Sequence, residues 1–550
     1  MYFRTKTTEG RRYLQIVESY RDGARVRQRV VATLGRLEAL QESGQLEALL
    51  RSGARFARQA MVLDAARQGT VEEAARRGIG APLVFERLWR DSGVGEVIRA
   101  LAAGTRFEFD LERAVFGTVL HRLCAPGSDR AGEKWLAGYA VEGAEVLRLH
   151  HFYRAMSWLG QPLAEPGGEG GVLGPRCTKD LVEERLFRRR RDLFTGLDLV
   201  FFDTTSLYFE GAGGEMLGQY GHSKDHRPDL KQMVVGAVLD SAGRPICNEL
   251  WPGNTADVTA LRPVAERLRE RFGAGQPCLV ADRGMISRAT LSWLEGQAAP
   301  WPYILGARMR KQKEVSEAVL GRAGRYREVY PERTRAKDPS PLAVKEVRVE
   351  GRRYVVCRNE EQARRDAAVR ETVLAALEEQ LRRGDKSLVG NRGYRRFLKA
   401  RGARFEIDRA KVAAEARYDG KWVLRTNTVL DAAEVALKYK QLWQVEALHR
   451  QVKSVLETRP VFHQHDANIR GHVFCSFLAL VLLKELQDRL AAAGLDLEWA
   501  DVIRDLDRLA EHELVQDGKR FGVRLGLTGC AGRVFQAVGV ALPPVVRQID

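Results

Sequence analysis

The sequence has 550 residues, too many for one hydrophobic core, and this length predicts three or more domains. Lysine and arginine number 89 against 72 aspartate and glutamate residues, which gives a formal net charge of +17. Such a basic excess points to nucleic acid as a partner, although an arginine-rich coding bias would produce the same excess. The longest apolar run, at 474–483, is too short to span a bilayer, and no secretory segment begins the chain. We therefore expect a cytoplasmic protein with no membrane partner.

The first part of the chain combines a hairpin pattern with a helical one. Residues 11–36 alternate apolar and polar positions around Asp22-Gly23, which is typical of a β-hairpin. From 57 to 195 the periodicity is mainly helical. Four consecutive arginines at 188–191 fit a solvated face and a phosphate-contacting patch about equally well.

A series of strands follows, and its order predicts a mixed α/β sheet. Antiparallel strand patterns come first, and helix and strand then alternate, which is the pattern of such a sheet. The predicted strands are 197–205, 231–240, 244–251, 276–284 and 301–309, with a helix at 260–272.

The pattern changes between 310 and 418. A hairpin with Glu350-Gly351 at its turn is followed by a charged helix, and together they predict an inserted α+β module. The sheet pattern then returns at 420–428, before long helices that we expect over 431–458 and 469–492.

Three acidic residues stand where rigid elements present them. Asp203 and Asp282 each follow an apolar strand, and Glu446 lies on the first of the long helices. Three carboxylates in a small volume repel one another unless a cation neutralises them, and oxygen ligands suit Mg²⁺. Two such ions can stabilise the attacking and leaving oxygens of a phosphoryl transfer. The competing interpretation is that either aspartate is an ordinary turn residue at the end of a strand.

The sequence around these carboxylates resembles the DDE transposases of bacterial insertion sequences, in the branch with a β-rich insertion between the second Asp and the Glu. Tyr439, Glu446 and Lys453 match the family's Tyr–two–Arg–three–Glu–six–Lys signature, whereas Leu442 stands at the Arg position. The resemblance covers most of 1–490. The other segments that carry it are FFDTTSLYFE, YGHSKDHRPDLKQMVVGAVLD, WPGNTADVTAL, VADRGMIS and YDGKWVLRTNT.

The resemblance implies a fold and a reaction. The fold is a ribonuclease-H-like mixed-sheet catalytic core. The reaction is cleavage of DNA at the ends of the element and joining of the 3′-OH ends to target DNA. Asp203, Asp282 and Glu446 are then the catalytic residues and the ligands of Mg²⁺ or Mn²⁺, with two ions expected.

The resemblance also implies DNA contacts. We expect Lys453 to hold a phosphate, Tyr439 to position DNA or the Glu helix, and Arg450 to supply the charge that is missing at the Arg position. Lys224 and Arg227 lie in a polar cluster after the first strand that favours a DNA-contacting loop over a zinc site. The implied partners are double-stranded element ends and target DNA, bound by a homodimer at the bacterial nucleoid.

These patterns predict an α/β chain in five parts, with DNA-end recognition outside the catalytic sheet. The parts are an N-terminal β-hairpin region (1–56), a helical DNA-end-binding region (57–195), the catalytic domain (196–309 and 419–492), the insertion (310–418) and a C-terminal helical region (493–550).

Two alternatives to a transposase stay open. One is a metal-dependent DNA endonuclease on the same fold that cuts without joining. The other is a catalytically inactive, transposase-derived DNA-binding protein, which the replacement of the expected Arg by Leu442 keeps possible. A nucleotide-driven motor is a poor third alternative, because the chain has no GxxxxGK[ST] loop.

Overall fold

The computed structural model divides the chain into two compact units, the first comprising Met1–Val84, Ala137–Ala140 and Ala492–Asp550 and the second Phe85–Leu136 and Val141–Ala491. In the part of the chain that is described, no helix has both the length and the apolar character needed to cross a membrane. The described residues are 1–22, 25–54, 72–164, 174–190, 198–273, 275–331, 338–383, 396–401, 404–516 and 519–549. Arg191, the last residue of the predicted arginine patch, lies outside them.

The first unit begins with the predicted hairpin. Strands β2 (Arg11–Asp22) and β3 (Arg25–Arg36) pair antiparallel with Asp22 opposite Arg25, as the hairpin pattern predicts, and Gly23 of the predicted turn lies outside the described residues. Strand β1 (Tyr2–Thr8) adds a third strand, and helices α1 (Leu37–Glu42) and α2 (Gln45–Ala54) follow.

A second sheet in this unit differs from the expected helical C-terminal region. Residues 493–550 do hold helices, but they also hold strands that pair with β4 (Glu72–Gly78), from the region predicted to be helical. The pairing partner lies far away in the sequence, so no local pattern shows it. The elements are β16 (Ala510–Gln516), β17 (Lys519–Arg524), β18 (Val546–Ile549), α18 (Trp499–Asp507) and α19 (Ala531–Val538).

Between 57 and 195, the described residues from 80 to 190 are mainly helical, as predicted, whereas β4 of the first unit is a strand. The long helix after the sheet, α17 (Asp466–Ala492), is buried along most of its length. Its Ser476 accepts a hydrogen bond from Arg122 of the earlier helical region. The helices of that region are α4 (Gly80–Ser92), α5 (Val94–Ala102), α6 (Leu111–Cys124), α7 (Asp129–Leu136), α8 (Leu149–Leu159) and α9 (Thr178–Arg190).

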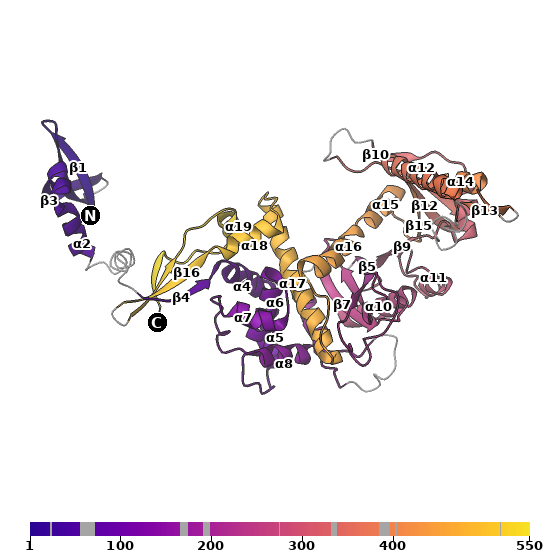
Figure 1. Cartoon of the computed structure of the whole chain (residues 1–550), viewed down its shortest axis with the longest axis horizontal. Helices are drawn as coiled ribbons and strands as arrows, with labels where there is room; N and C mark the ends of the chain where they lie inside the picture. Colours follow the sequence, from indigo (N-terminus) through magenta and orange to yellow (C-terminus); the bar gives the residue numbers. More distant parts are fainter. Residues whose placement is uncertain are drawn as a thin grey trace. The chain divides into compact units, whose positions relative to one another are not determined.

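The second unit is built on a nine-stranded mixed sheet with the order β10-β11-β12-β15-β9-β8-β5-β6-β7 (Figure 1). Strands β5, β8 and β9 run parallel, and every other neighbouring pair is antiparallel. The strands are β5 (Leu199–Tyr208), β6 (Gln232–Leu239), β7 (Pro245–Pro252), β8 (Cys278–Ala281), β9 (Tyr303–Gly306), β10 (Arg327–Tyr330), β11 (Leu342–Val349), β12 (Arg352–Arg358) and β15 (Lys421–Thr426).

The predicted insertion contributes β10, β11 and β12 to the main sheet and β13 (Leu398–Arg401) and β14 (Arg404–Ile407) to a separate two-stranded sheet. Its hairpin, β11 and β12, turns at Glu350 and Gly351, which both have a positive φ, and β12 pairs with β15. The insertion therefore extends the edge of the main sheet. Its remaining elements are η1 (Glu314–Val319), α12 (Glu360–Arg383) and α14 (Arg409–Ala416).

Helices α10 (Asp257–Phe272) and α11 (Arg288–Glu295) contribute to the core that fixes β5 to β8. Phe202 and Trp251 are fully buried in this core, each stabilising it by roughly 1.5–3 kcal/mol or more. A Cβ on Gly236 would lie 2.6 Å from the Trp251 ring, so only glycine fits there.

Buried charges tie α9 to the sheet. Arg271 of α10 is 6% exposed and donates hydrogen bonds to Glu183 (2.6 Å) and Glu184 (3.0 Å) of α9. It also donates to Glu249 of β7 at 3.2 Å. A buried ion pair adds little net stability while it is intact, but removing one partner leaves charge uncompensated in a medium of low dielectric constant.

We predict that Arg271→Met lowers the free energy of unfolding by about 3–5 kcal/mol, because three buried carboxylates lose their common cation. Arg269→Met is the matched control on the exposed side of the same helix and should change stability by about 0.5 kcal/mol or less. Denaturant unfolding of both variants measures the difference. Equal stability of the two variants would contradict the network's role.

We also predict that acid destabilises the second unit through His121 of α6. Burial, helped by the Arg122 charge, lowers the pKa of His121 to about 4. The unfolded chain therefore binds a proton below about pH 6.5 while the folded chain does not, and stability falls by up to about 1.4 kcal/mol per pH unit between pH 6.5 and 4. His121→Gln should flatten the slope of unfolding free energy against pH by about one proton, and an unchanged slope would contradict the assignment.

Candidate functional site

The register of two parallel strands brings the two predicted aspartates together. Phe202 of β5 lies opposite Ala281 of β8, and Asp203 and Asp282 are the next residues of their chains. Both carboxylates therefore lie where the parallel pairing of β5 with β8 ends, although β5 itself continues to Tyr208. They line one pocket of about 380 Å³. Glu446 lines the same pocket, so the structure gathers the three residues that the sequence singled out.

Asp203 is the carboxylate most affected by its surroundings. Burial raises the pKa of its carboxyl to about 6, and the charges of Asp282 and Asp257 act in the same direction. The ammonium of Lys224 acts in the opposite direction. Negative charge is thus concentrated at this end of the sheet, which is the condition for attracting a cation.

Glu446 comes from a helix that is shorter than predicted. The helix expected over 431–458 divides into α15 (Ala432–Lys440), α16 (Trp443–Arg450) and a π-helical segment, η3 (Gln451–Val455). Leu442, Val445 and Leu448 are buried, whereas Glu446 is exposed toward the pocket.

Tyr439 supports the second aspartate. Its hydroxyl donates a 2.9 Å hydrogen bond to Asp282 Oδ1. Burial and the Asp282 charge raise the pKa of Tyr439, so the phenol stays protonated and remains a donor. A Cβ on Gly306 would lie 2.5 Å from this hydroxyl, so the approach requires glycine at that position.

Lys224 is bound inside the pocket rather than presented to the outside. Its ammonium donates to the Thr204 carbonyl (2.7 Å) and hydroxyl (2.8 Å) and forms an ion pair with Asp257 at 3.1 Å. The Thr204 hydroxyl donates in turn to Asp257 Oδ1 at 2.7 Å. Asp257, at the start of α10, is therefore a fourth carboxylate of the pocket, to which the sequence alone assigned no role.

Lys453 also lines the pocket. Its ammonium donates to Asp225 at 2.8 Å, and both side chains are largely buried. Burial lowers the pKa of Lys453, while Asp225 opposes that shift. Arg459 lies 3.4 Å from the same carboxylate. The chain thus holds Lys453 at a set position beside Glu446.

Two predicted DNA-contacting arginines lie elsewhere. Arg227 is exposed and pairs with Asp229 at 2.9 Å, with its guanidinium over the ring of Tyr208. Arg450 is exposed on the last turn of α16, and the described residues that line the pocket do not include it. The structure brings neither arginine to the carboxylates.

His449 is a pocket residue that the sequence reasoning missed. It lies three residues after Glu446, is 7% exposed and hydrogen-bonds the Asp203 backbone. Its Nε2 is buried and has no hydrogen-bond partner. Burial lowers the pKa of His449 to about 3, so the ring is neutral. The spacing from Glu446 was the signal that could have identified it.

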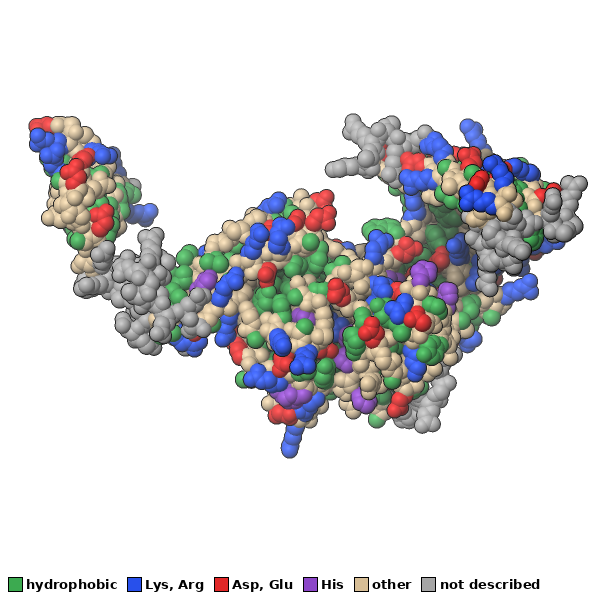
Figure 2. All heavy atoms as spheres, in the orientation of Figure 1, with side chains coloured by type: hydrophobic (Ala, Val, Ile, Leu, Met, Phe, Trp, Pro, Cys, Tyr) green, Lys and Arg blue, Asp and Glu red, His purple; other side chains and the backbone are tan. Residues whose placement is uncertain are grey.

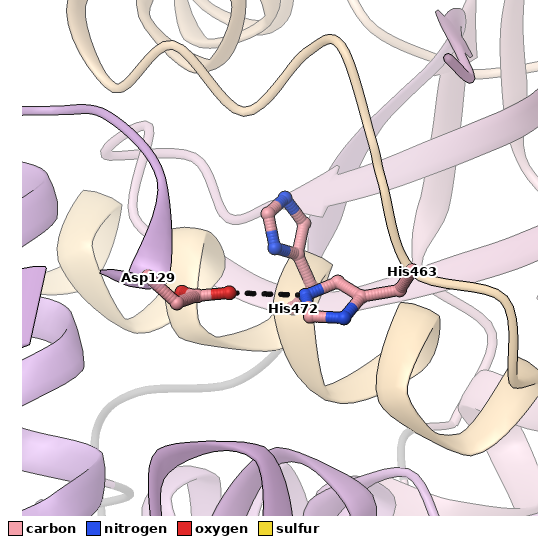
Figure 3. A group of neighbouring side chains, drawn as sticks. All are labelled: Asp129, His463 and His472. Carbon is pink, nitrogen blue, oxygen red and sulfur yellow. Dashed lines mark ion pairs between the residues drawn. The ribbon is translucent and has the colours of Figure 1, made fainter. Parts of the chain in front are cut away.

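A second polar group, formed by Asp129, His463 and His472, has its ligand atoms within 4.8 Å of one another (Figure 3). Asp129 pairs with His463 at 3.2 Å. Both nitrogens of His472 are engaged, because Arg122 lies 2.9 Å from Nδ1 and the Thr458 carbonyl 3.0 Å from Nε2. A guanidinium in that position opposes a metal ion, so packing between helices explains this group better.

The three carboxylates of the first pocket lie farther apart than the members of the Asp129 group. Among the described residues, the Asp129 group is the only set of three potential ligands that close together, so the oxygens of Asp203, Asp282 and Glu446 are spaced more widely. Their pocket adjoins a second one of about 640 Å³, which Asp282, Glu446 and Tyr439 line together with residues of the insertion. The basic residues that line this second pocket are Arg283, Arg310, Arg370, Arg396 and Lys421.

Comparisons with known proteins identify the family. The family described as "IS1634 family transposase, N-terminal domain" matches residues 3–67, and the family described as "Transposase DDE domain" matches residues 195–482, more than half of the chain. No curated protein matches. Among solved structures, the piggyBac transposase synaptic complex with hairpin DNA is similar at 12% identity and a TM-score of 0.39, over 78% of this chain and 79% of that one. The chain belongs to the insertion-sequence DDE transposases.

Proposed function

We propose that this chain cleaves DNA at the ends of an insertion sequence and joins the 3′-OH ends to target DNA, with Asp203, Asp282 and Glu446 as the catalytic carboxylates. The observation that carries the proposal is the placement of all three around one pocket. Asp203 and Asp282 lie where the parallel pairing of β5 with β8 ends, and Glu446 lies on α16. The strand order β7-β6-β5-β8-β9, antiparallel and then parallel, supports a ribonuclease-H-like core.

The donor set of the pocket fits divalent cations. Its carboxylate oxygens are the hard ligands that Mg²⁺ and Mn²⁺ take. Burial raises the pKa of Asp203, with a smaller contribution from the charges of Asp282 and Asp257, and a bound cation would offset both effects. Asp203, Asp282 and Glu446 would hold the ions. Bound there, two divalent ions supply charge stabilisation to the attacking and leaving oxygens of a phosphoryl transfer.

The chain's own residues position the reaction. Tyr439 fixes Asp282 through its hydrogen bond, and Lys224 fixes Asp257 and Thr204 beside Asp203. Lys453, held by Asp225, would bind a DNA phosphate as a point charge. Each group is oriented before DNA arrives, which reduces the entropy lost on reaching the reactive geometry.

The DNA path would pass through the adjoining pocket. Basic side chains there can bind phosphates, although Arg310 is already paired with Glu415 at 2.9 Å. On the face drawn in Figure 2, Lys and Arg side chains are dispersed among acidic ones. We assign DNA-end recognition to the N-terminal sheet and the helical region, in a complex of two copies.

We predict that the purified chain with Mg²⁺ or Mn²⁺ cleaves DNA carrying the terminal repeats that flank its gene and yields joined products. Asp282→Asn should reduce both by at least about a thousandfold, because the ions lose a rigid ligand. Asp229→Asn is the matched control, since Asp229 is exposed and lies away from the pocket. Electrophoresis of labelled DNA measures both products.

Each contrary outcome favours one alternative. Cleavage without joining favours the endonuclease. Tight DNA binding without cleavage in either metal favours the inactive DNA-binding protein. Activity that survives Asp282→Asn would remove the carboxylate site from the mechanism.

We predict that Tyr439→Phe weakens Mn²⁺ binding by about 10–100-fold, because loss of a hydrogen bond to a metal-binding carboxylate has an effect of that size. Calorimetric titration of Mn²⁺ measures it. Tyr220→Phe, at an exposed tyrosine outside the pocket, is the control and should leave the affinity unchanged. Equal affinities of the Tyr439→Phe variant and the wild type would show that this hydroxyl does not support metal binding.

A further inference from the structure

His449 lines the carboxylate pocket, yet the function proposed above gives it no task. It is 7% exposed and lies on α16, three residues after Glu446. Side chains three apart on a helix lie on the same side. His449 and Glu446 can therefore approach the same point in the pocket.

The ring of His449 is held in one orientation. The Asp203 backbone accepts a hydrogen bond from the ring, and Nε2 is buried without a partner. The bond to Asp203 is therefore made by Nδ1, which carries the proton in the neutral ring and leaves a lone pair on Nε2. An unpaired buried acceptor destabilises the folded chain, so a group that binds this lone pair is favoured.

Neighbouring cations do not satisfy that lone pair. The ammonium of Lys224 is engaged with Thr204 and Asp257, and that of Lys453 with Asp225. Among the described residues that line the pocket, His449 therefore offers a neutral nitrogen, Nε2, as a potential metal ligand beside the carboxylates. Metal-binding histidines have the same arrangement, with one ring nitrogen fixed by a backbone or carboxylate acceptor and the other directed to the ion.

We propose that His449 binds, through Nε2, the same divalent ion as Glu446. A Glu-x-x-His pair at this spacing serves as a metal-binding unit in helical carboxylate proteins. Imidazole nitrogen suits transition ions, whereas Mg²⁺ takes oxygen ligands, so His449 favours Mn²⁺ over Mg²⁺ at this position. The proposal rests on the metal-binding role given above to Asp203, Asp282 and Glu446.

Two substitutions separate a ligand from a packing residue. His449→Asn keeps an amide donor near the place of Nδ1, and so can keep the bond to the Asp203 backbone, but it removes Nε2. His449→Gln places its amide near Nε2 instead. If His449 only holds the backbone of Asp203, the Asn variant behaves as the wild type does and the Gln variant is impaired. If His449 is a ligand, the Asn variant loses metal affinity.

The test is pulsed electron paramagnetic resonance of Mn²⁺ bound to the full chain. We expect a ¹⁴N coupling in the wild type that disappears in His449→Asn, with Mn²⁺ affinity lowered at least about tenfold and Mg²⁺ affinity lowered less. His463→Asn is the control, because it alters the other Asp–His group and should keep the coupling. Circular dichroism checks that each variant is folded.

The outcomes distinguish this proposal from the proposed function. Mn²⁺ binding that is weakened by Asp282→Asn but shows no ¹⁴N coupling overturns the role of His449 and leaves the carboxylate site in place. Mn²⁺ binding that Asp282→Asn leaves unchanged overturns both. A coupling that survives in His449→Asn and disappears in His463→Asn assigns the ion to the other Asp–His group and also overturns both.

Discussion

Parallel pairing of β5 with β8 is the constraint on which the rest of the site depends. Their register sets Asp203 beside Asp282, and the buried body of each strand prevents the carboxylates from moving apart. Burial raises the pKa of Asp203, and the charges of Asp282 and Asp257 add to this effect. Lys224 pairs with Asp257, and Tyr439 donates a hydrogen bond to Asp282. A cation that binds these carboxylates only in the folded chain would stabilise the fold.

Buried ion pairs on one side and strand pairing on the other hold the sheet in place around the carboxylate pocket. Arg271 joins α10, α9 and β7 through buried carboxylates, on the side of the sheet where Phe202 and Trp251 pack. The insertion extends the other edge, because β12 pairs with β15. The two pockets share Asp282 and Glu446, and the basic pocket is also lined by β15 of the main sheet and by α12 of the insertion.

The sequence predicted the features that depend on local pattern, and it missed those that depend on distant partners. Alternation and apolar runs located β5 and β8 and hence Asp203 and Asp282, because a strand buried on both faces needs such a run. The strand β16 was missed because its partner β4 lies far away in the sequence. Helical periodicity continues through the break between α15 and α16, so it gave no sign of that break. The roles of Asp257 and His449 arise only when α10 and α16 meet β5.

Leu442, which stands at the Arg position of the family signature, is an interior packing residue in this structure. The side chain is 5% exposed and precedes the first turn of α16, so it packs in the interior. A guanidinium there would have to be buried or to displace the turn. The cations of the pocket come instead from Lys224, in the loop after β5, and from Lys453, in η3. The replacement therefore leaves the pocket with its positive charge, which weighs against treating Leu442 as the mark of an inactive protein.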